Sequence, residues 1–467
     1  MKRIFFRLST STPGVDSGCR QNNQLSIKIA LHFFHRLGHD SGRMIDIKLL
    51  REESERVKIA VKNKNVVIDI DRILALDSDR RRQQGELDLL NAQRKEVAKA
   101  KDIEKGKQLK EASATLEKNL AITETELNAL LFKVPNLPSE DTPVGKDESE
   151  NVVLRKVGTP TVFAFEPKDH VALGIALGLI DNETATKVAG TRFTYLKGDL
   201  VLMQFALVQF AFSVLKNETT LSQIIKTAGL SVKPNAFVPI TPPLMIKPEV
   251  FQKMARLEPK DERYHIVSDD LYLIGSAEHT LGPLHIHETL KEAQLPLRYM
   301  AFTPAFRREA GSYGKDTKGI LRLHQFDKIE MESFTTPETG MQEQDFFVAI
   351  QEHLMQALGL PYQVVMTCTG DQGDPDARHL DIETWMPAEG KYRETHSADY
   401  MTDYQARRLN TKVKSADGSI SFVHMNDATV FAIGRTLVAI MENYQQEDGT
   451  ILIPDVLRAF MQKEKIG

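Results

Sequence analysis

Apolar residues recur at alternating spacings of three and four between Asp71 and Leu131, in a stretch that is otherwise highly charged. A polar break at 102–108 divides them into Ile73, Leu76, Leu87, Leu90 and Val97 before it and Leu109, Ala112, Leu116, Leu120, Leu127 and Leu130 after it. This spacing gives each helix one apolar stripe, and two helices with facing stripes form an antiparallel coiled coil. The pattern therefore predicts a helical hairpin whose arms have about 30 residues and span on the order of 45 Å each.

The distal half of this predicted hairpin is basic, because it contains Arg94, Lys95, Lys99, Lys101, Lys105, Lys107 and Lys110. An extended basic surface suits the phosphate backbone of a nucleic acid. A solvated coiled coil or a dimerisation rod explains the same charges equally well, since such surfaces are usually rich in lysine.

A second helical pattern, GTRFTYLKGDLVLMQFALVQFAF at residues 190–212, has a turn-prone head and a strongly apolar tail. Its large apolar residues exceed one buried stripe, so this helix needs burial on several sides. A subunit interface provides such burial, and so does the centre of a core. Between the two helical patterns, residues 134–150 contain three prolines and a cluster of acids, which is typical of a linker.

Composition narrows the class of protein. With 467 residues, of which 41% are hydrophobic, the chain is long enough for two domains. No apolar run reaches the roughly 20 residues of a membrane helix, so we expect no membrane span. The two cysteines, Cys19 and Cys368, support neither a disulfide framework nor a cysteine zinc site and favour a reducing compartment. The net charge of −4 says little, because a nearly neutral protein can still carry a basic surface.

Residues 1–43 differ from the rest of the chain. They are basic and contain scattered Ser, Thr and Gly without a helical period. This composition is typical of an organelle presequence, and noncoding sequence read from an upstream start would look the same. We exclude the segment from the fold in either case.

The densest candidate chemistry lies in the stretch FRREAGSYGKDTKGILRLHQFDKIE, where a loop rich in Gly and Lys separates two polar ends. Two strands joined by a basic loop fit this pattern. Side chains two residues apart in a strand share a face, so Arg307 aligns with Glu309, and Arg322 aligns with Phe326 and Glu330. An arginine fork matches phosphate oxygens and a ring stacks on a base, which favours a nucleotide site over a simple salt-bridged hairpin.

FRRE followed by RxxxFxxxE resembles motif 2 of the class II aminoacyl-tRNA synthetases, and the whole stretch resembles the version of bacterial-type seryl-tRNA synthetases. The resemblance implies that Arg307 binds the α-phosphate of ATP and the carboxylate that attacks it. It assigns the adenine to Glu309 and Phe326, with Arg308 in the same ATP site. Glu330 is expected to contact the serine substrate.

The segment LYLIGSAEHTLGPLHIH resembles the family's serine-binding segment, usually Thr-Ala-Glu or Thr-Ser-Glu, with Ser276, Ala277 and Glu278 at those places. A small hydroxyl beside a carboxylate holds an ammonium group and excludes bulk, as a small polar amino acid requires. The run HIHE at 285–288 offers two further histidines. Because no Cys or Asp cluster accompanies them, we expect no zinc.

The segment RETHSADYMTDYQARR resembles a stretch that commonly reads Glu-Ile-Ser-Ser in the family. Glu394 is predicted to hold Mg²⁺ that bridges the triphosphate, since this ion shares its shell between carboxylate and phosphate oxygens. The implied ATP site includes Glu394, Thr395, His396 and Ser397. Thr395 and His396 depart from the family pattern, so their roles carry over less directly.

GRTLVAIMENYQ resembles motif 3, whose arginine at a helix start binds the γ-phosphate, and Arg435 occupies that place. A helix N-terminus also favours negative charge. Thr429 stands where the family typically has a serine that touches the substrate hydroxyl; it keeps the hydroxyl, and its extra methyl tightens the pocket. Arg307 and Arg435 are thus the predicted catalytic residues.

Together the motifs imply an α+β fold. A class II catalytic domain, an antiparallel sheet flanked by helices, is expected at residues 151–467, and an N-terminal tRNA-binding domain with the hairpin at 44–140. Residues 141–150 would link the two, and Met44 takes the place of a family initiator. The resemblance also implies that the hairpin grips the long variable arm of a tRNA and that residues 190–212 contain motif 1 of a homodimer.

The implied activity is serine–tRNA ligation with ATP and Mg²⁺ in the cytoplasm, by way of seryl-adenylate and transfer to the 3′ end of tRNA(Ser). Whether tRNA(Sec) is also an acceptor is left open. Two alternatives are an activator that loads an amino acid onto a carrier protein and a catalytically inactive coiled-coil scaffold. Relatives of the first kind are expected to lack the hairpin. The second is opposed by the intact set Arg307, Glu309, Glu330, Glu394 and Arg435.

Overall fold

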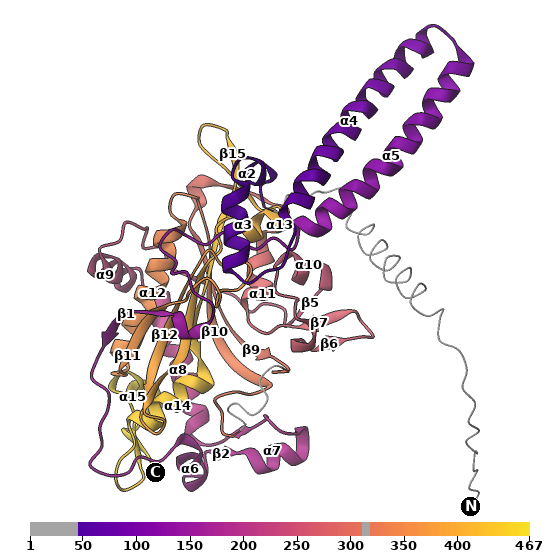
Figure 1. The fold of residues 1–467 in the computed structure, drawn as a ribbon. Helices are drawn as coiled ribbons and strands as arrows, with labels where there is room; N and C mark the ends of the chain where they lie inside the picture. Colours follow the sequence, from indigo (N-terminus) through magenta and orange to yellow (C-terminus); the bar gives the residue numbers. More distant parts are fainter. Residues whose placement is uncertain (1–44, 311–317) are drawn as a thin grey trace, which may run out of the picture. The chain divides into compact units, whose positions relative to one another are not determined.

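The computed structural model describes residues 45–310 and 318–467, so the leader at residues 1–43 and the tip of the basic loop lie outside it (Figure 1). Contacts divide the described chain into two compact units. One is Leu76–Asn128, and the other combines residues 45–75 with Ala129–Gly467. The predicted extent of the N-terminal domain, 44–140, stays a prediction, because compactness separates only the hairpin.

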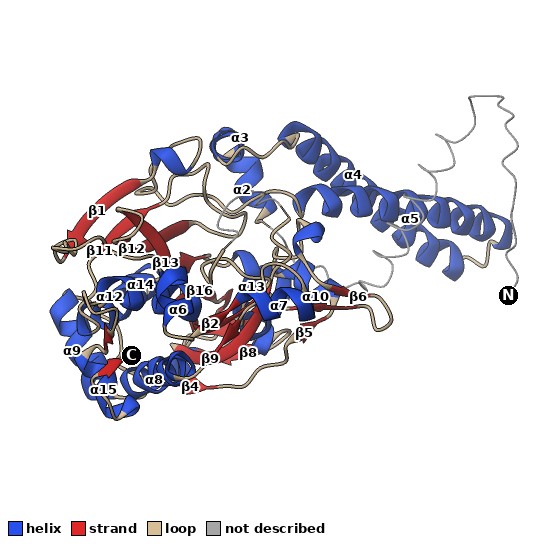
Figure 2. Ribbon diagram, turned by 90° about the horizontal axis from the view of Figure 1, so that it is seen from below, coloured by secondary structure: helices blue, strands red, loops and turns tan. Residues whose placement is uncertain are grey.

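The hairpin unit contains most of α4 (Ile70–Lys99) and of α5 (Ile103–Leu131), which lie side by side in opposite directions in Figures 1 and 2. Its buried positions include Leu87, Ser113, Leu120 and Leu127. Steps of four, three and four residues lead along the buried face from residue 109 to Ser113, residue 116 and Leu120. Ser113 therefore takes the buried position that the sequence pattern assigned to Ala112, and Ala112 is exposed. A small polar residue can occupy such a stripe where the helices pack closely.

The larger unit is built on a sheet to which eight strands of the described chain belong. Neighbouring strands pair antiparallel except β4, which runs parallel to β9 at one edge. In order across the sheet they are β1 (Val152–Val157), β11 (Tyr362–Met366), β12 (Arg378–Met386), β13 (Lys391–Tyr400), β16 (His424–Ala432), β10 (Gln325–Thr335), β9 (Leu297–Phe306) and β4 (Val238–Pro239).

Helices cover one face of this sheet and enclose the main apolar core. α12 packs on β16 and β13, and α14 packs on β12 and β10 (Figure 2). The helices of this layer are α8 (Asp199–Leu215), α9 (Glu218–Ala228), α12 (Gly340–Ala357), α14 (Ile433–Asn443) and α15 (Asp455–Met461). Strand β12 alternates strictly between buried and half-buried positions, so one of its faces meets this core and the other is free for polar side chains.

Shorter elements complete the larger unit. The helices are α2 (Ile47–Glu52), α3 (Ser54–Asn63), α6 (His170–Ala176), α7 (Asn182–Ala189), α10 (Pro248–Lys253), α11 (Glu278–Leu281) and α13 (Tyr404–Leu409). The short strands are β2 (Ile180–Asp181), β3 (Tyr195–Leu196), β5 (Met245–Ile246), β6 (His265–Ile266), β7 (Leu271–Leu273), β8 (Thr289–Lys291), β14 (Lys412–Lys414), β15 (Ile420–Phe422), β17 (Ile451–Leu452) and β18 (Lys465–Ile466).

The segment predicted as a linker is tied to the catalytic body. The side-chain amide of Asn136 donates to the carbonyl oxygens of Pro375 and Met401, both at 2.8 Å, and Val134 is fully buried.

Within the described residues, no single helix has both the length and the apolar character to cross a membrane. The pair α8 and α9 meets those two criteria only when taken together, across a bend of 76°.

Candidate active site

The strands β9 and β10 form the predicted hairpin and place Arg307 directly after the last residue of β9. The backbone N–H of Arg307 donates to the carbonyl of His324 at 2.9 Å, which continues the ladder by one residue. Its guanidinium carbon lies 5.3 Å from the centre of the Phe326 ring, and its Nε donates to the carbonyl of Gly275 at 3.1 Å. Arg307 is therefore fixed at both its backbone and its side chain.

Arg322 and Glu309 lie outside the two strands. The spacing predicts that Arg322 shares a strand face with Phe326. This prediction is wrong, because β10 begins only at Gln325. Glu309 has a positive φ of 54°, and its Oε2 accepts from Nη1 of Arg322 at 3.2 Å. The neighbouring Arg308 is exposed. Glu309 is thus held by an arginine on the returning arm of the hairpin. Its contact with adenine stays a prediction.

The serine segment turns from β7 into α11 and brings Ser276 onto β10. Ser276 Oγ donates to Glu330 Oε1 at 2.7 Å, and Lys328 forms an ion pair with the same carboxylate. Ala277 is fully buried. Lys328 was missed in the sequence, although its place two residues before Glu330 puts it on the same strand face.

Glu330 is an acceptor with unused capacity. Its side chain is 1% exposed, and its Oε2 has no hydrogen-bond partner among the described residues. Burial raises the pKa of Glu330, against the opposing effect of Lys328. A buried carboxylate oxygen without a donor is costly unless a ligand supplies one, so this atom is suited to a substrate hydroxyl or ammonium.

Thr429 and Ser397 continue this row across the sheet. Thr429 is paired with Glu330 in the register of β16 and β10, and its hydroxyl lies 3.2 Å from that of Ser397 on β13. Together with Ser276, these side chains form a small polar cluster around Glu330. Sequence-predicted serine-site residues from three separate segments are therefore brought together.

Arg435 is the third residue of α14 and forms an ion pair with Glu394, with Nη1 and Oε1 3.0 Å apart. The helix start is packed tightly, because a side chain on Gly434 would come within 2.8 Å of the carbonyl of Ile320. Desolvation raises the pKa of Glu394, but the charges of Arg435, His379 and Arg307 outweigh it, so the pKa lies below its usual value. Arg307 and Arg435, far apart in sequence, thus act on one carboxylate.

Thr395 and His396 face the interior of the sheet, each 1% exposed. The Thr395 hydroxyl lies 2.7 Å from that of Thr384 and 2.8 Å from Nδ1 of His396. A bulge between Ile382 and Glu383 shifts the alternation here, so Glu394 stays exposed while two residues in a row are buried. Burial lowers the pKa of His396 to about 3, so its ring is neutral near pH 7. These two side chains form hydrogen bonds within the sheet, and their place in the ATP site stays a prediction.

Two histidine groups bear on the question of a metal. His285 is engaged at both ring nitrogens, 2.8 Å from Glu288 and 2.8 Å from the Tyr299 hydroxyl. Asp376, His379 and Asp399 have ligand atoms within 4.8 Å of one another. However, the two nitrogens of His379 face Asp399 and Asp381, and although burial lowers its pKa, these carboxylates raise it well above the usual range. Both ring nitrogens of His379 therefore already have a carboxylate partner.

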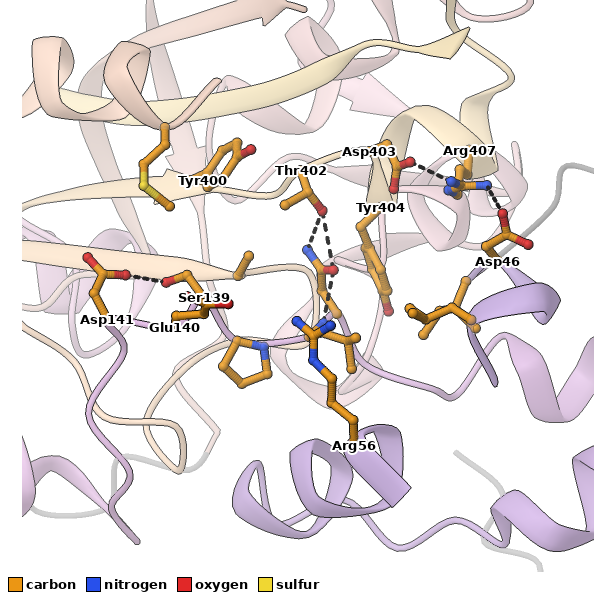
Figure 3. Close-up of a pocket in the computed structure, with 17 residues that line it drawn as sticks. Asp46, Arg56, Ser139, Glu140, Asp141, Tyr400, Thr402, Asp403, Tyr404 and Arg407 are labelled. Carbon is orange, nitrogen blue, oxygen red and sulfur yellow. Dashed lines mark hydrogen bonds and ion pairs between the residues drawn. The ribbon is translucent and has the colours of Figure 1, made fainter. Parts of the chain in front are cut away.

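A separate cavity of about 690 Å³ lies between α2, residues 136–141 and the segment from Tyr400 to Arg407 (Figure 3). Arg407 is bound there by Asp403 at 2.6 Å. None of the predicted substrate or ATP residues lines this cavity, so it is distinct from the site described above.

Comparison with known proteins agrees with this geometry. A family model described as the seryl-tRNA synthetase N-terminal domain matches residues 44–138, and one described as the tRNA synthetase class II core domain (G, H, P, S and T) matches residues 262–444. A serine–tRNA ligase of Fervidobacterium nodosum is 40% identical over 435 residues, 90% of this chain and 98% of that protein. A serine–tRNA ligase of Thermosipho melanesiensis is 43% identical over 441 residues, 91% of this chain and 100% of that protein.

Solved structures agree as well. The crystal structure of seryl-tRNA synthetase from Pyrococcus horikoshii complexed with ATP superposes with a TM-score of 0.82 at 35% identity, covering 91% of this chain and 99% of that one. The cytoplasmic serine–tRNA ligase from Naegleria fowleri in complex with AMP gives 0.80 at 30% identity with the same coverage. The predicted family and α+β fold are thereby confirmed: the chain belongs to the seryl-tRNA synthetase family of class II aminoacyl-tRNA synthetases.

Proposed function

We propose that this protein is an ATP-dependent serine–tRNA ligase that makes seryl-adenylate and transfers the seryl group to the 3′ end of tRNA(Ser). The observation that carries the proposal is the cluster of Ser276, Glu330 and Thr429 on β10 and β16, next to strand β13, where Glu394 forms an ion pair with Arg435. The first group is suited to a short amino acid with a hydroxyl, and the second to a triphosphate.

Adenylate formation needs little covalent help from the protein. The serine carboxylate attacks the α-phosphate, and pyrophosphate leaves. Arg307, fixed by Gly275 and His324, would hold the α-phosphate and the carboxylate, while Arg435 would hold the γ-phosphate at the start of α14. Positioning and fixed positive charge account for most of the rate enhancement expected of such a displacement at phosphorus. Phe326 offers its ring to the adenine.

Mg²⁺ fits the residues present. Glu394 has an ionised, half-exposed carboxylate, and hard oxygen ligands of this kind suit Mg²⁺ shared with phosphates. When bound there, the ion would neutralise charge on the triphosphate. We propose Glu394 as its protein ligand, with the Ser397 hydroxyl nearby.

Serine selection follows from the pocket. Glu278 is proposed to hold the ammonium group, and Glu330 with Thr429 to hold the hydroxyl. Alanine has no hydroxyl, so its binding would leave the buried Glu330 oxygen without a hydrogen-bond donor. A polar site of this kind binds alanine much more weakly than serine. Threonine would add a methyl group beside Thr429, where the pocket is already narrowed.

The basic hairpin is proposed to bind the tRNA, which favours tRNA over a carrier protein as acceptor. Because ATP, serine and tRNA occur together in the cytoplasm, we propose that the enzyme acts there.

The proposed function is tested by pyrophosphate exchange into ATP with each of the 20 amino acids. We expect serine alone to support exchange well above background, and charging assays to show seryl transfer to tRNA(Ser). Exchange driven best by another amino acid, or by none, would contradict the proposal.

We also propose that the chain forms a homodimer through α8. This helix is apolar on its buried side, yet Leu202 and Phe205 on its outer side are 52% and 48% exposed. Residues three apart lie on one helix face, so the two form an apolar surface that a second copy would cover.

Replacing Phe205 with glutamate is expected to separate the subunits, raising the dissociation constant by about 100-fold or more, because the change places a charge in an apolar interface. Light scattering after size-exclusion chromatography measures the mass. The matched control is Ile420→Glu on β15, where the apolar side chain is 59% exposed. A Phe205→Glu protein that stays dimeric at low micromolar concentration would rule out α8 as the interface.

A further inference from the structure

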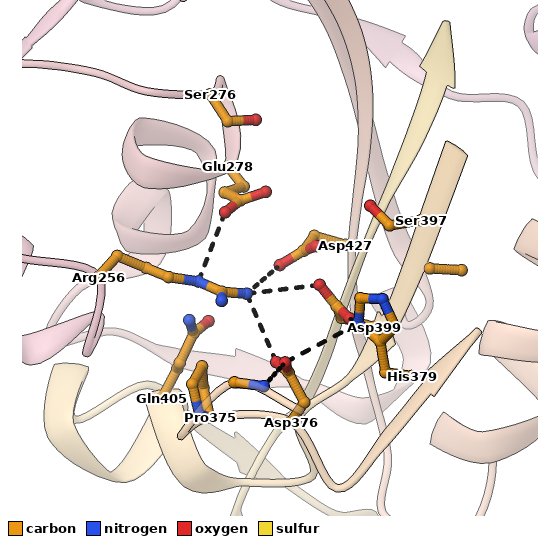
Figure 4. A network of polar contacts seen from close by, with 12 residues as sticks. Arg256, Ser276, Glu278, Pro375, Asp376, His379, Ser397, Asp399, Gln405 and Asp427 are labelled. Carbon is orange, nitrogen blue, oxygen red and sulfur yellow. Dashed lines mark hydrogen bonds and ion pairs between the residues drawn. The ribbon is translucent and has the colours of Figure 1, made fainter. Parts of the chain in front are cut away.

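Arg256, in the loop after α10, lies among the carboxylates of Glu278, Asp376, Asp399 and Asp427 (Figure 4). Its Nε is 3.4 Å from Glu278 Oε1. Its Nη2 is 3.5 Å from one oxygen each of Asp376, Asp399 and Asp427. The arginine side chain is only 16% exposed, so this is a buried network.

Strand register shows how the network adjoins the substrate pocket. Asp427 is paired with Asp399 on one side and with Glu332 on the other, so the three carboxylates form a row across β13, β16 and β10. Each lies two residues from a member of the pocket, which puts both rows on the same face of the sheet. The second row therefore lies about 7 Å further along the strands than the row that contains Ser397, Thr429 and Glu330.

The second row brings buried carboxyl groups close together. Glu332 is fully buried, and neither of its oxygens has a hydrogen-bond partner among the described residues. Burial, together with the charges of Glu278 and Glu330, raises the pKa of Glu332 well above its usual value. His379 offsets Asp399. Arg256 is the cation that reaches from this row to Glu278.

Glu278 depends on this cation for its own state. Burial raises the pKa of Glu278, but Arg256 provides the largest opposing effect, and the pKa lies well below its usual value. A buried carboxylate without a charged partner tends to take up a proton, and a neutral carboxyl binds an ammonium group poorly. The ammonium site thus requires a neighbouring positive charge that does not itself touch the substrate.

We propose that Arg256 is a positioning residue for serine binding: it holds Oε1 of Glu278 and so presents an ionised carboxylate in a fixed orientation to the substrate ammonium group. This role rests on the proposed function and adds to it a residue that determines the affinity for serine. Arg256 acts on the amino acid through Glu278, whereas ATP is bound by Arg307 and Arg435, so its effect should be confined to serine.

The test is the set Arg256→Met, Arg256→Lys and the double variant Arg256→Met with Asp376→Asn, which removes one buried negative charge along with the positive one. Serine-dependent pyrophosphate exchange gives KM for serine, KM for ATP and kcat. We expect Arg256→Met and the double variant to raise the KM for serine by about 10- to 100-fold, the effect of leaving a buried carboxylate without its charged partner. The KM for ATP should change less than about threefold, and Arg256→Lys should recover part of the loss.

Arg378→Met is the matched control, because Arg378 is also a buried arginine with two carboxylate partners, Asp141 at 2.8 Å and Asp345 at 2.7 Å. It should lower the unfolding temperature without changing the KM for serine. An unchanged KM for serine in the folded double variant, or an equal effect of Arg378→Met, would overturn the role of Arg256. Absence of serine-dependent exchange in the unaltered protein would instead contradict the proposed function itself.

Discussion

Replacing Arg307 with alanine is expected to lower serine-dependent pyrophosphate exchange by about 100- to 1,000-fold, the usual cost of removing one charge-stabilising donor. Arg307 is anchored by Gly275 and His324 and lies over Phe326, at the position proposed for the α-phosphate. The loss should appear mainly in kcat, because the charge on the α-phosphate grows as the serine carboxylate attacks.

Arg155→Ala is the matched comparison, since it removes an exposed arginine of β1 at the edge of the sheet. We expect it to cost less than about tenfold, in line with the small contribution of exposed charges. Thermal unfolding and light scattering would show that both variants are folded and retain the same mass. Near-normal exchange in folded Arg307→Ala would refute the role assigned to this residue.

Replacing Leu76–Asn128 with a short Gly-Ser linker is expected to leave serine-dependent exchange within about threefold of normal and to abolish tRNA charging. These residues form a compact unit of their own, while all the proposed ATP and serine residues belong to the other. Adenylate formation and tRNA binding should therefore be separable. Equal loss of both activities would contradict the division of roles.

A milder version of this test neutralises only charge. Lys105 and Lys107 are exposed on α5, and changing both to serine should weaken tRNA binding. The slope of the logarithm of the binding constant against the logarithm of the salt concentration should fall by about one for each lost phosphate contact. The control changes Lys216 and Lys226, two exposed lysines of the catalytic body, to serine. Similar effects of both pairs would show a nonspecific loss of charge rather than a binding surface on the hairpin.

Much of the fold could be predicted from the sequence because its strongest signals are local. The spacing of three and four gives the two long helices, and the gap between FRRE and the returning segment gives the hairpin of β9 and β10. Phe326 and Glu330, four residues apart on one strand, could be assigned to one face by period alone. Ser113 shows the limit of this reasoning. The pattern of apolar residues predicts Ala112 in the buried stripe of α5, but the helical spacing places the polar Ser113 there.

The rest of the site depends on contacts that periodicity does not encode. Arg256 follows a short helix in a loop, and only the folded sheet brings Asp376, Asp399 and Asp427 to it. Thr395 and His396 are buried one after the other because a bulge shifts the alternation of β13, which the sequence does not reveal. Lys328, in contrast, could have been found from its spacing to Glu330.

The central claim is that Arg307 and Arg435 bind one triphosphate although 127 intervening residues separate them in the chain. A crystal structure of the protein with ATP, Mg²⁺ and serine tests it most directly. The account predicts guanidinium nitrogens of Arg307 and Arg435 within about 3 Å of α- and γ-phosphate oxygens of the same nucleotide. Guanidinium groups that face different cavities, or a nucleotide bound away from both, would contradict it.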